Sequence, residues 1–164
     1  MLPRIRVLAF AVVVVVALAA VVRLLGSPAT PAAQTSRVTV VSNAPFAQVA
    51  GALERAIADE KMALVCHADA QRGAAARGAT IKGNQVLMVF RNDLAVRLLA
   101  ADPSAGFEAP IRIYLYENAN GTATVAYTPP SVVFAPYRHP EVQTVARYLD
   151  PVFKTIVDRG VAGR

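Results

Sequence analysis

An uninterrupted apolar run near the N-terminus constrains this chain more than any other feature of its sequence. The run extends from Val7 to Val22 and follows two basic residues, Arg4 and Arg6. A basic start followed by an apolar stretch is typical of an export signal or a signal anchor. Arg23 can snorkel toward water, so we expect residues 1–25 to form a hydrophobic helix. The folded domain must therefore be built from the residues that follow.

A retained anchor is favoured over a cleaved signal peptide, because no clear cleavage site follows the apolar run. Small residues at 17–19 would place a cut inside the run, and the candidate at 30–32 carries a proline. The basic residues keep the N-terminus in the cytoplasm. The sequence therefore predicts a single-pass protein of a bacterial-type cytoplasmic membrane, with its domain on the outer (periplasmic or extracellular) side. Secretion after signal cleavage is the alternative.

The remaining chain is expected to contain a flexible linker at 26–36, one domain at 37–160 and a short tail at 161–164. The net charge of +6 overstates the basicity of that domain, because three of the 17 basic residues flank the apolar run. The other 14 stand against 11 acids, and a scattered charge of +3 does not indicate nucleic-acid binding. A single cysteine, Cys66, excludes an internal disulfide.

Hydrophobic spacing predicts that strands and helices are mixed within this domain. Strands are expected at 38–41, 62–68, 85–90, 111–117 and 122–128, and helices at 46–61, 94–101 and 141–159. Ser42 and Asn43 are expected to cap the first helix, and the last is expected to continue with a kink through Pro151. Segment 69–84 fits either a short helix or a loop. This order predicts an α+β fold, a small mixed or antiparallel sheet with helices packed on one face.

A hairpin across the turn at 118–121 is expected to gather aromatic side chains. Alternation along the first strand places Arg112, Tyr114 and Tyr116 on one face. If Glu117 pairs with Thr122, Tyr127 joins the same face. Tyrosine and arginine are enriched at recognition surfaces. A second core layer or a subunit contact is nevertheless favoured over a ligand pocket, because large exposed aromatic patches are rare.

The cluster Arg91-Asn92-Asp93 stands just before an apolar helical stripe. Asn92 or Asp93 is expected to cap that helix through its side chain. The alternative is an anion site formed by Arg91 and the helix N-terminus. Asp93 argues against that alternative, because its own carboxylate would occupy the anion position.

Cys66 and His67 resemble a nucleophile and its base, but neighbouring strand residues point to opposite faces. Cys66 is therefore expected to be a small buried core residue. His67 and Asp69 share a face, where a strand-end hydrogen bond is favoured over an oriented catalytic pair. His67 and His139 are weak candidates for a metal or haem ligand, because no HExxH, CxxCH or carboxylate cluster accompanies them.

The segment VLMVFRNDLAVRLLAADPSAGFEAPIRIYLYENANGTATVAYTPPSVV, residues 86–133, resembles domain-of-unknown-function family 302 (DUF 302). The matching positions are Asn92, Pro103, Gly106, Pro110, Gly121 and Tyr127. The resemblance extends over roughly residues 37–160 and implies a compact α+β domain, seen as dimers, with no settled activity. Arg91, Asp93 and Pro129 depart from the family pattern, and the resemblance assigns no catalytic residue.

The sequence favours a membrane-anchored or exported binding or assembly module over an enzyme, because it shows no nucleophile–base pair, metal motif or phosphate loop. The expected ligand- or partner-binding residues are Arg112, Tyr114, Tyr116, Tyr127, Asn92 and Arg91. A homodimer is plausible, and no cofactor is expected. The runner-up is a haem- or redox-linked envelope protein that uses His67 or His139.

Overall fold

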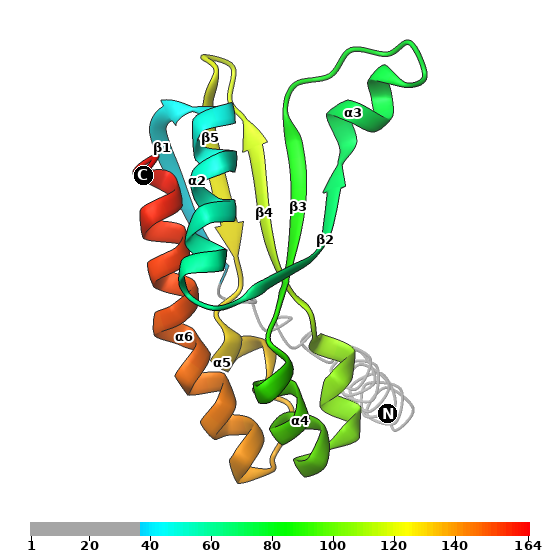
Figure 1. Ribbon diagram of the computed structural model, residues 1–164, viewed down its shortest axis with the longest axis vertical. Helices are drawn as coiled ribbons and strands as arrows, with labels where there is room; N and C mark the ends of the chain where they lie inside the picture. Colours follow the sequence, from blue (N-terminus) through cyan, green and yellow to red (C-terminus); the bar gives the residue numbers. More distant parts are fainter. Residues whose placement is uncertain (1–36) are drawn as a thin grey trace, which may run out of the picture. The chain divides into compact units, whose positions relative to one another are not determined.

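Five antiparallel strands form one sheet in the order β1-β5-β4-β3-β2 (Figure 1). The strands are β1 (Val38–Pro45), β2 (Ala63–Asp69), β3 (Asn84–Phe90), β4 (Ile111–Glu117) and β5 (Thr122–Tyr127). This computed structural model of the chain describes residues 37–164. The α+β prediction is confirmed, and every pairing is antiparallel. β3 is an interior strand, because it lies between β4 and β2.

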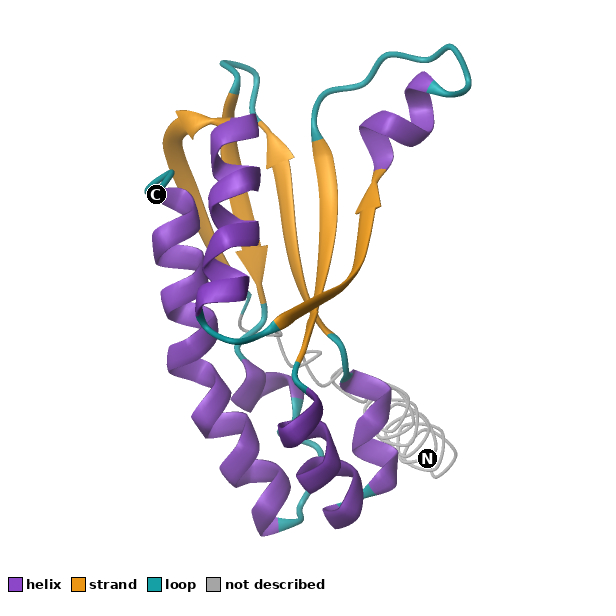
Figure 2. Cartoon of the chain, in the orientation of Figure 1, coloured by secondary structure: helices purple, strands orange, loops and turns teal. Residues whose placement is uncertain are grey.

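Two long helices, α2 (Phe46–Asp59) and α6 (Pro140–Val161), pack against one face of the sheet (Figure 2). Each presents apolar residues at helical spacing, and these meet the alternate apolar residues of the strands. The largest fully buried side chains are Phe134, Phe153, Leu53, Ile57, Leu87, Ile113, Leu115 and Ile156. The last helix runs through Pro151 as one element, as its unbroken apolar stripe predicted.

Four shorter elements complete the described chain: α3 (Ala70–Ala75), α4 (Asn92–Ala101), the 3-10 helix η1 (Pro103–Glu108) and α5 (Pro130–Val133). The ambiguous segment 69–84 contains both of the expected alternatives, a short helix followed by a loop. α4, η1, α5 and the first half of α6 extend the molecule beyond one end of the sheet (Figure 1).

The opposite face of the sheet carries no covering helix within residues 37–164 (Figure 2). Along β4, Ile111, Ile113 and Leu115 are buried beneath the helices, whereas Arg112 and Tyr116 are exposed on the open face. Val41 on β1 also points outward and is 67% exposed. The hairpin face is therefore not a second core layer of the described domain.

The hairpin register differs from the prediction by one residue. Glu117 pairs with Ala123 rather than Thr122, and Tyr127 lies opposite Ile113. The backbone N–H of Asn118 donates to the Thr122 carbonyl, which leaves a three-residue loop ending at Gly121 with φ of 82°. Since side chains alternate along a strand, this shift moves Tyr127 to the helix-covered face. The prediction that Tyr127 joins the aromatic surface is wrong.

The predicted N-caps of α2 and α4 are also wrong. β1 continues to Pro45, so Ser42 lies within the strand, where its hydroxyl donates to the Val161 carbonyl. Helix α4 begins at Asn92, which makes Arg91 the residue at its N-cap, without a side-chain hydrogen bond. Asn92 and Asp93 lie in the first turn instead. The strand before α2 continues further than predicted, whereas the strand before α4 ends at Phe90 as predicted and the helix itself begins two residues early.

The predicted hydrophobic helix at 1–25 and linker at 26–36 lie outside the described residues. Within residues 37–164, none of the helices is long and apolar enough to cross a membrane. The tail predicted at 161–164 is not separate from the domain. Val161 still belongs to α6, and the Gly163 carbonyl accepts a hydrogen bond from the Gln48 side chain of α2.

Candidate functional site

A groove of about 680 Å³ lies on the open face of the sheet, at the end where η1 enters β4. Its floor comes from alternate residues of β3, β4 and β5, and its wall from the segment between η1 and β4. The lining residues used below are Arg37, Met88, Phe107, Glu108, Arg112 and Tyr114. The groove therefore combines an apolar, partly aromatic floor with guanidinium groups.

Register explains why these side chains meet. Met88 pairs with Arg112, and Val86 pairs with Tyr114, so all four project from the same face of β3 and β4. The Asn84 side-chain amide donates to the Tyr114 hydroxyl at 2.6 Å. The rings of Tyr114 and Tyr116 lie 5.6 Å apart between centroids. Tyr114 is thus held in place beside the groove, whereas Tyr116 lies next to it on the same strand but outside the lining.

The two charged side chains Arg112 and Glu108 differ in how far other groups of the described chain already contact them. Within the described chain, no carboxylate lies within ion-pair distance of Arg112, whose side chain is exposed. Glu108 accepts a hydrogen bond from the Tyr137 hydroxyl at 3.3 Å. Burial of the Tyr137 phenol and the nearby Glu108 carboxylate both raise the pKa of Tyr137, which keeps it protonated and able to donate. Among residues 37–164, Arg112 is therefore a cation without an ion-pair partner, and the Glu108 carboxylate is partly occupied by its hydrogen bond.

Of the residues that line the groove, sequence reasoning found Arg112, Tyr114 and Tyr127, although the Tyr127 ring packs on the helix-covered face. It missed Arg37, Met88, Phe107 and Glu108. Phe107 is 89% exposed, which is unusual for a phenylalanine. Its position in PSAGFEAP, outside any apolar period, was the signal that could have identified it as a surface residue. Met88 could have been found by placing the strand at 84–90 in register with β4.

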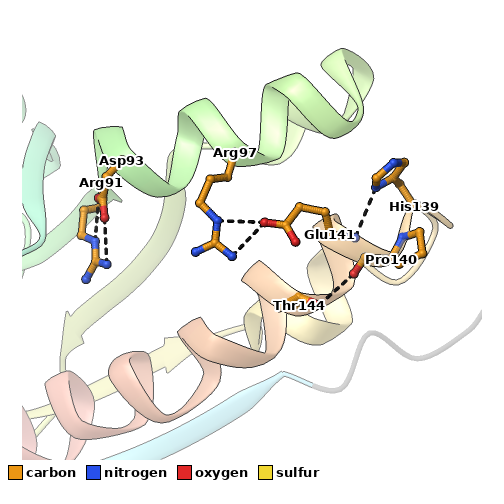
Figure 3. A network of polar contacts seen from close by, with 7 residues as sticks. All are labelled: Arg91, Asp93, Arg97, His139, Pro140, Glu141 and Thr144. Atoms are coloured by element: carbon orange, nitrogen blue, oxygen red, sulfur yellow. Dashed lines mark hydrogen bonds and ion pairs between the residues drawn. The ribbon is translucent and has the colours of Figure 1, made fainter.

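Arg91 and Asn92 lie away from this groove. The Arg91 guanidinium donates to both oxygens of Asp93, Nε to Oδ1 at 2.8 Å and Nη2 to Oδ2 at 3.0 Å (Figure 3). It also lies 5.3 Å from the centroid of the Tyr148 ring. The hydrogen bond from Arg91 is the main cause that lowers the pKa of Asp93. The Asp93 carboxylate therefore occupies the position that a bound anion would need.

His139 serves as the N-cap of α6. Its Nδ1 accepts from the backbone N–H of Glu141 at 3.2 Å, and Arg97 of α4 donates to the Glu141 carboxylate at 2.8 Å (Figure 3). These contacts join α4 to the first turn of α6. The geometry gives His139 a structural role in the described chain.

His67 and Cys66 point to opposite faces of β2, because Cys66 pairs with Met88 and His67 with Leu87. A bulge at Val65 places Leu64 on the same face as His67 and opposite to Cys66. The nearest ion-pair partner of His67 is Glu54 of α2 at 3.5 Å, whereas Asp69 caps α3 through the Arg72 N–H. The expected pairing of His67 with Asp69 is therefore wrong.

The prediction that Cys66 is buried is also wrong. Cys66 is exposed. It lies on the open face of β2, an edge strand, so no layer covers it. Among the residues that the structure describes, no group of three His, Cys, Asp or Glu side chains is arranged to hold a metal ion.

The comparisons with known proteins fit this geometry. The family model for the domain of unknown function DUF302 matches residues 38–158, which is most of the chain. The chain belongs to the DUF302 family. The crystal structure of the uncharacterized conserved protein DUF302 from Bacillus stearothermophilus matches it with a TM-score of 0.65, at 18% identity. That match covers 75% of this chain and 96% of the other, and it shows a shared fold. A search of curated proteins finds no match.

The DUF302 match includes every strand of the sheet and all of the groove lining except Arg37. Arg91 and Asp93, two of the positions that depart from the family pattern, form an ion pair with each other at the start of α4. Pro129 stands immediately before α5 and is its N-cap.

Proposed function

We propose that this DUF302 chain is a non-enzymatic binding module whose working surface is the groove on the open sheet face. The observation that carries the proposal is Arg112, an exposed guanidinium without an ion-pair partner in the described chain, set on an apolar floor. A ligand that fits has an anionic group for Arg112 and an apolar or aromatic part for Met88, Phe107 and Tyr114. Buried apolar contacts give affinity, and a few placed polar groups give orientation.

The N-terminal segment supports the second part of the proposal, a membrane tether. Its basic start and apolar run would hold the domain at the outer face of a cytoplasmic membrane. Two copies that pack together through Val41 and Tyr116, which lie on the open face outside the groove lining, would protect both side chains from water, so a homodimer is part of the proposal. Light scattering coupled to size-exclusion chromatography of the full chain measures the oligomeric state.

Anilinonaphthalene sulfonate, an anionic aromatic dye that fluoresces in apolar surroundings, is the probe that tests the groove. We expect the full chain to bind it saturably. Arg112→Gln should weaken binding about 10- to 100-fold, because a hydrogen bond to a charged group is worth roughly 1.5–3 kcal/mol. Binding of N-phenyl-1-naphthylamine, the neutral parent of the dye, should change less than threefold, roughly 0.6 kcal/mol.

Arg147→Gln is the matched control, because Arg147 is exposed on α6 and lines no part of the groove. It should leave both affinities unchanged. Equal affinity for the dye in Arg112→Gln and the parent chain would refute the groove as an anion site. An equal loss in both arginine variants would show that general charge, rather than this site, attracts the dye.

A further inference from the structure

A second cavity, of about 260 Å³, lies where the sheet meets α4, η1 and the middle of α6. Its wall consists of apolar side chains from these elements. The lining residues that the argument uses are Met62, Leu94, Ala95, Leu98, Leu99 and Leu149. It is separate from the groove in its chemistry, because the groove floor carries Arg112 and Tyr114 and this wall does not.

The wall residues show that the space is reachable. Met62, Leu94, Leu98 and Leu149 keep between 3% and 7% of their surface accessible, although all lie in the core. Val89, Phe134 and Val145 also line the space but are only 1% exposed, so they form its buried end. Protein interiors are closely packed, so an apolar space of about 260 Å³ beside the core is a local departure from that rule.

The cavity has no free charge to offer. Its single charged lining residue is Arg91, and the guanidinium already donates to both carboxylate oxygens of Asp93. The third donor of Arg91, Nη1, points to the Tyr148 hydroxyl at 3.4 Å. An anionic ligand would have to break the ion pair, whereas a neutral apolar ligand leaves it intact.

Leu99 and Gly106 form one side of the cavity, where α4 faces η1. A Cβ atom on Gly106 would lie 2.7 Å from Leu99 Cδ2, so the glycine allows the Leu99 side chain to approach η1 closely. Leu99 is itself 43% exposed. This flexible side chain therefore stands between the cavity and solvent.

We propose that this cavity is a binding site for a neutral hydrophobic molecule, or part of one, of the size of one fused aromatic ring pair. Apolar cavities remain dry and take up apolar ligands, and a cavity of about 150 Å³ accommodates benzene. The larger volume here fits indole, the probe we choose. The proposal concerns a different site from the groove, so either can fail without the other.

Methyl NMR of the full chain in a lipid nanodisc tests the inference by titration with indole. We expect saturable shifts of the Leu94, Leu98 and Leu149 methyl groups, with the Val49 and Ile57 methyl groups unchanged. Ala95→Leu fills part of the cavity and should weaken indole binding at least tenfold. Indole-3-carboxylate, the anionic analogue, should bind the parent chain at least tenfold more weakly than indole.

Ala100→Leu is the control, because Ala100 is exposed on α4 and does not line the cavity. It should bind indole as the parent chain does. The inference is overturned if indole gives no saturable shifts at these methyl groups. It is also overturned if Ala95→Leu binds indole undiminished, since the probe would then occupy another place. A raised melting temperature for Ala95→Leu without indole binding by the parent chain would identify a packing defect and equally refute a ligand site.

Discussion

At the scale of single residues, the Tyr127 phenol lies in the core and stacks on Phe153 at 6.2 Å between ring centroids. Tyr114, on the neighbouring strand, has its hydroxyl held by Asn84 on the open face. The two tyrosines thus have different chemical roles although both lie in the hairpin. The buried phenol contributes to stability, and the other lines the groove.

Alkaline titration should separate these roles. Burial, and secondarily the Asp158 carboxylate, raise the pKa of Tyr127 above its ordinary value near 10. The folded state holds this proton more tightly than the unfolded state, so its contribution to stability is complete below about pH 10 and declines as the pH rises toward the folded pKa. We expect Tyr127→Phe to show a weaker loss of stability above that pH than the parent chain.

Urea unfolding followed by circular dichroism between pH 8 and about 11 measures this difference. Tyr116→Phe serves as the control, because the Tyr116 ring is on the open face. Identical pH profiles for Tyr127→Phe and the parent chain would show that Tyr127 ionisation does not limit alkaline stability.

At the scale of secondary-structure elements, the contact between α2 and α6 depends on Gly160. A Cβ atom at this position would lie 2.3 Å from Leu53 Cδ2 and 2.5 Å from Leu53 Cγ. Leu53 is fully buried, so it has little room to move. The last turn of α6 therefore approaches α2 more closely than any residue with a side chain allows.

Gly160→Ala should destabilise the domain. Alanine favours the helix by about 1 kcal/mol, but overpacking a core typically costs about 1–3 kcal/mol, so we expect a net loss of about 1 kcal/mol. Gly73→Ala in α3 is the matched substitution, because nothing lies within 4 Å of its Cβ position. It should stabilise by about 0.5–1 kcal/mol. Urea unfolding of both variants measures the two free energies, and a stabilising Gly160→Ala would contradict the packing argument.

At the scale of the whole molecule, the two faces of the sheet differ. α2 and α6 cover one face of the sheet, and the other is left for a ligand or a second copy. The edge strand β2 is interrupted by a bulge at Val65, which discourages open-ended strand addition at that edge. Association through the open face is therefore favoured over association through β2.

The full chain produced in a bacterial host should sediment with membranes and resist extraction by alkaline carbonate. A variant with Val13→Lys and Val15→Lys should be released, because two buried charges each cost roughly 2.5–3.5 kcal/mol near the centre of a span. Intact mass spectrometry of the membrane fraction shows whether residues 1–25 are retained. A soluble, shortened chain would instead support secretion after cleavage.

Local pattern determined most of the architecture. Period-two alternation gave β4 its buried and exposed faces, and the helical stripe of α6 predicted one helix through Pro151, because both depend on neighbours within a few residues. The Arg91–Asp93 ion pair is local in the same way, since the two residues are only two positions apart.

Other features depended on contacts between distant segments. One residue of hairpin register moved Tyr127 into the core, and a bulge separated Leu64 from Cys66. The groove joins Arg112 to Phe107 and Arg37, and the apolar cavity joins α4 to α6, across long stretches of chain. The sequence alone specified which side chains alternate and which helices are amphipathic. Only the tertiary structure decided which alternating face stays uncovered, because that depends on where two distant helices pack.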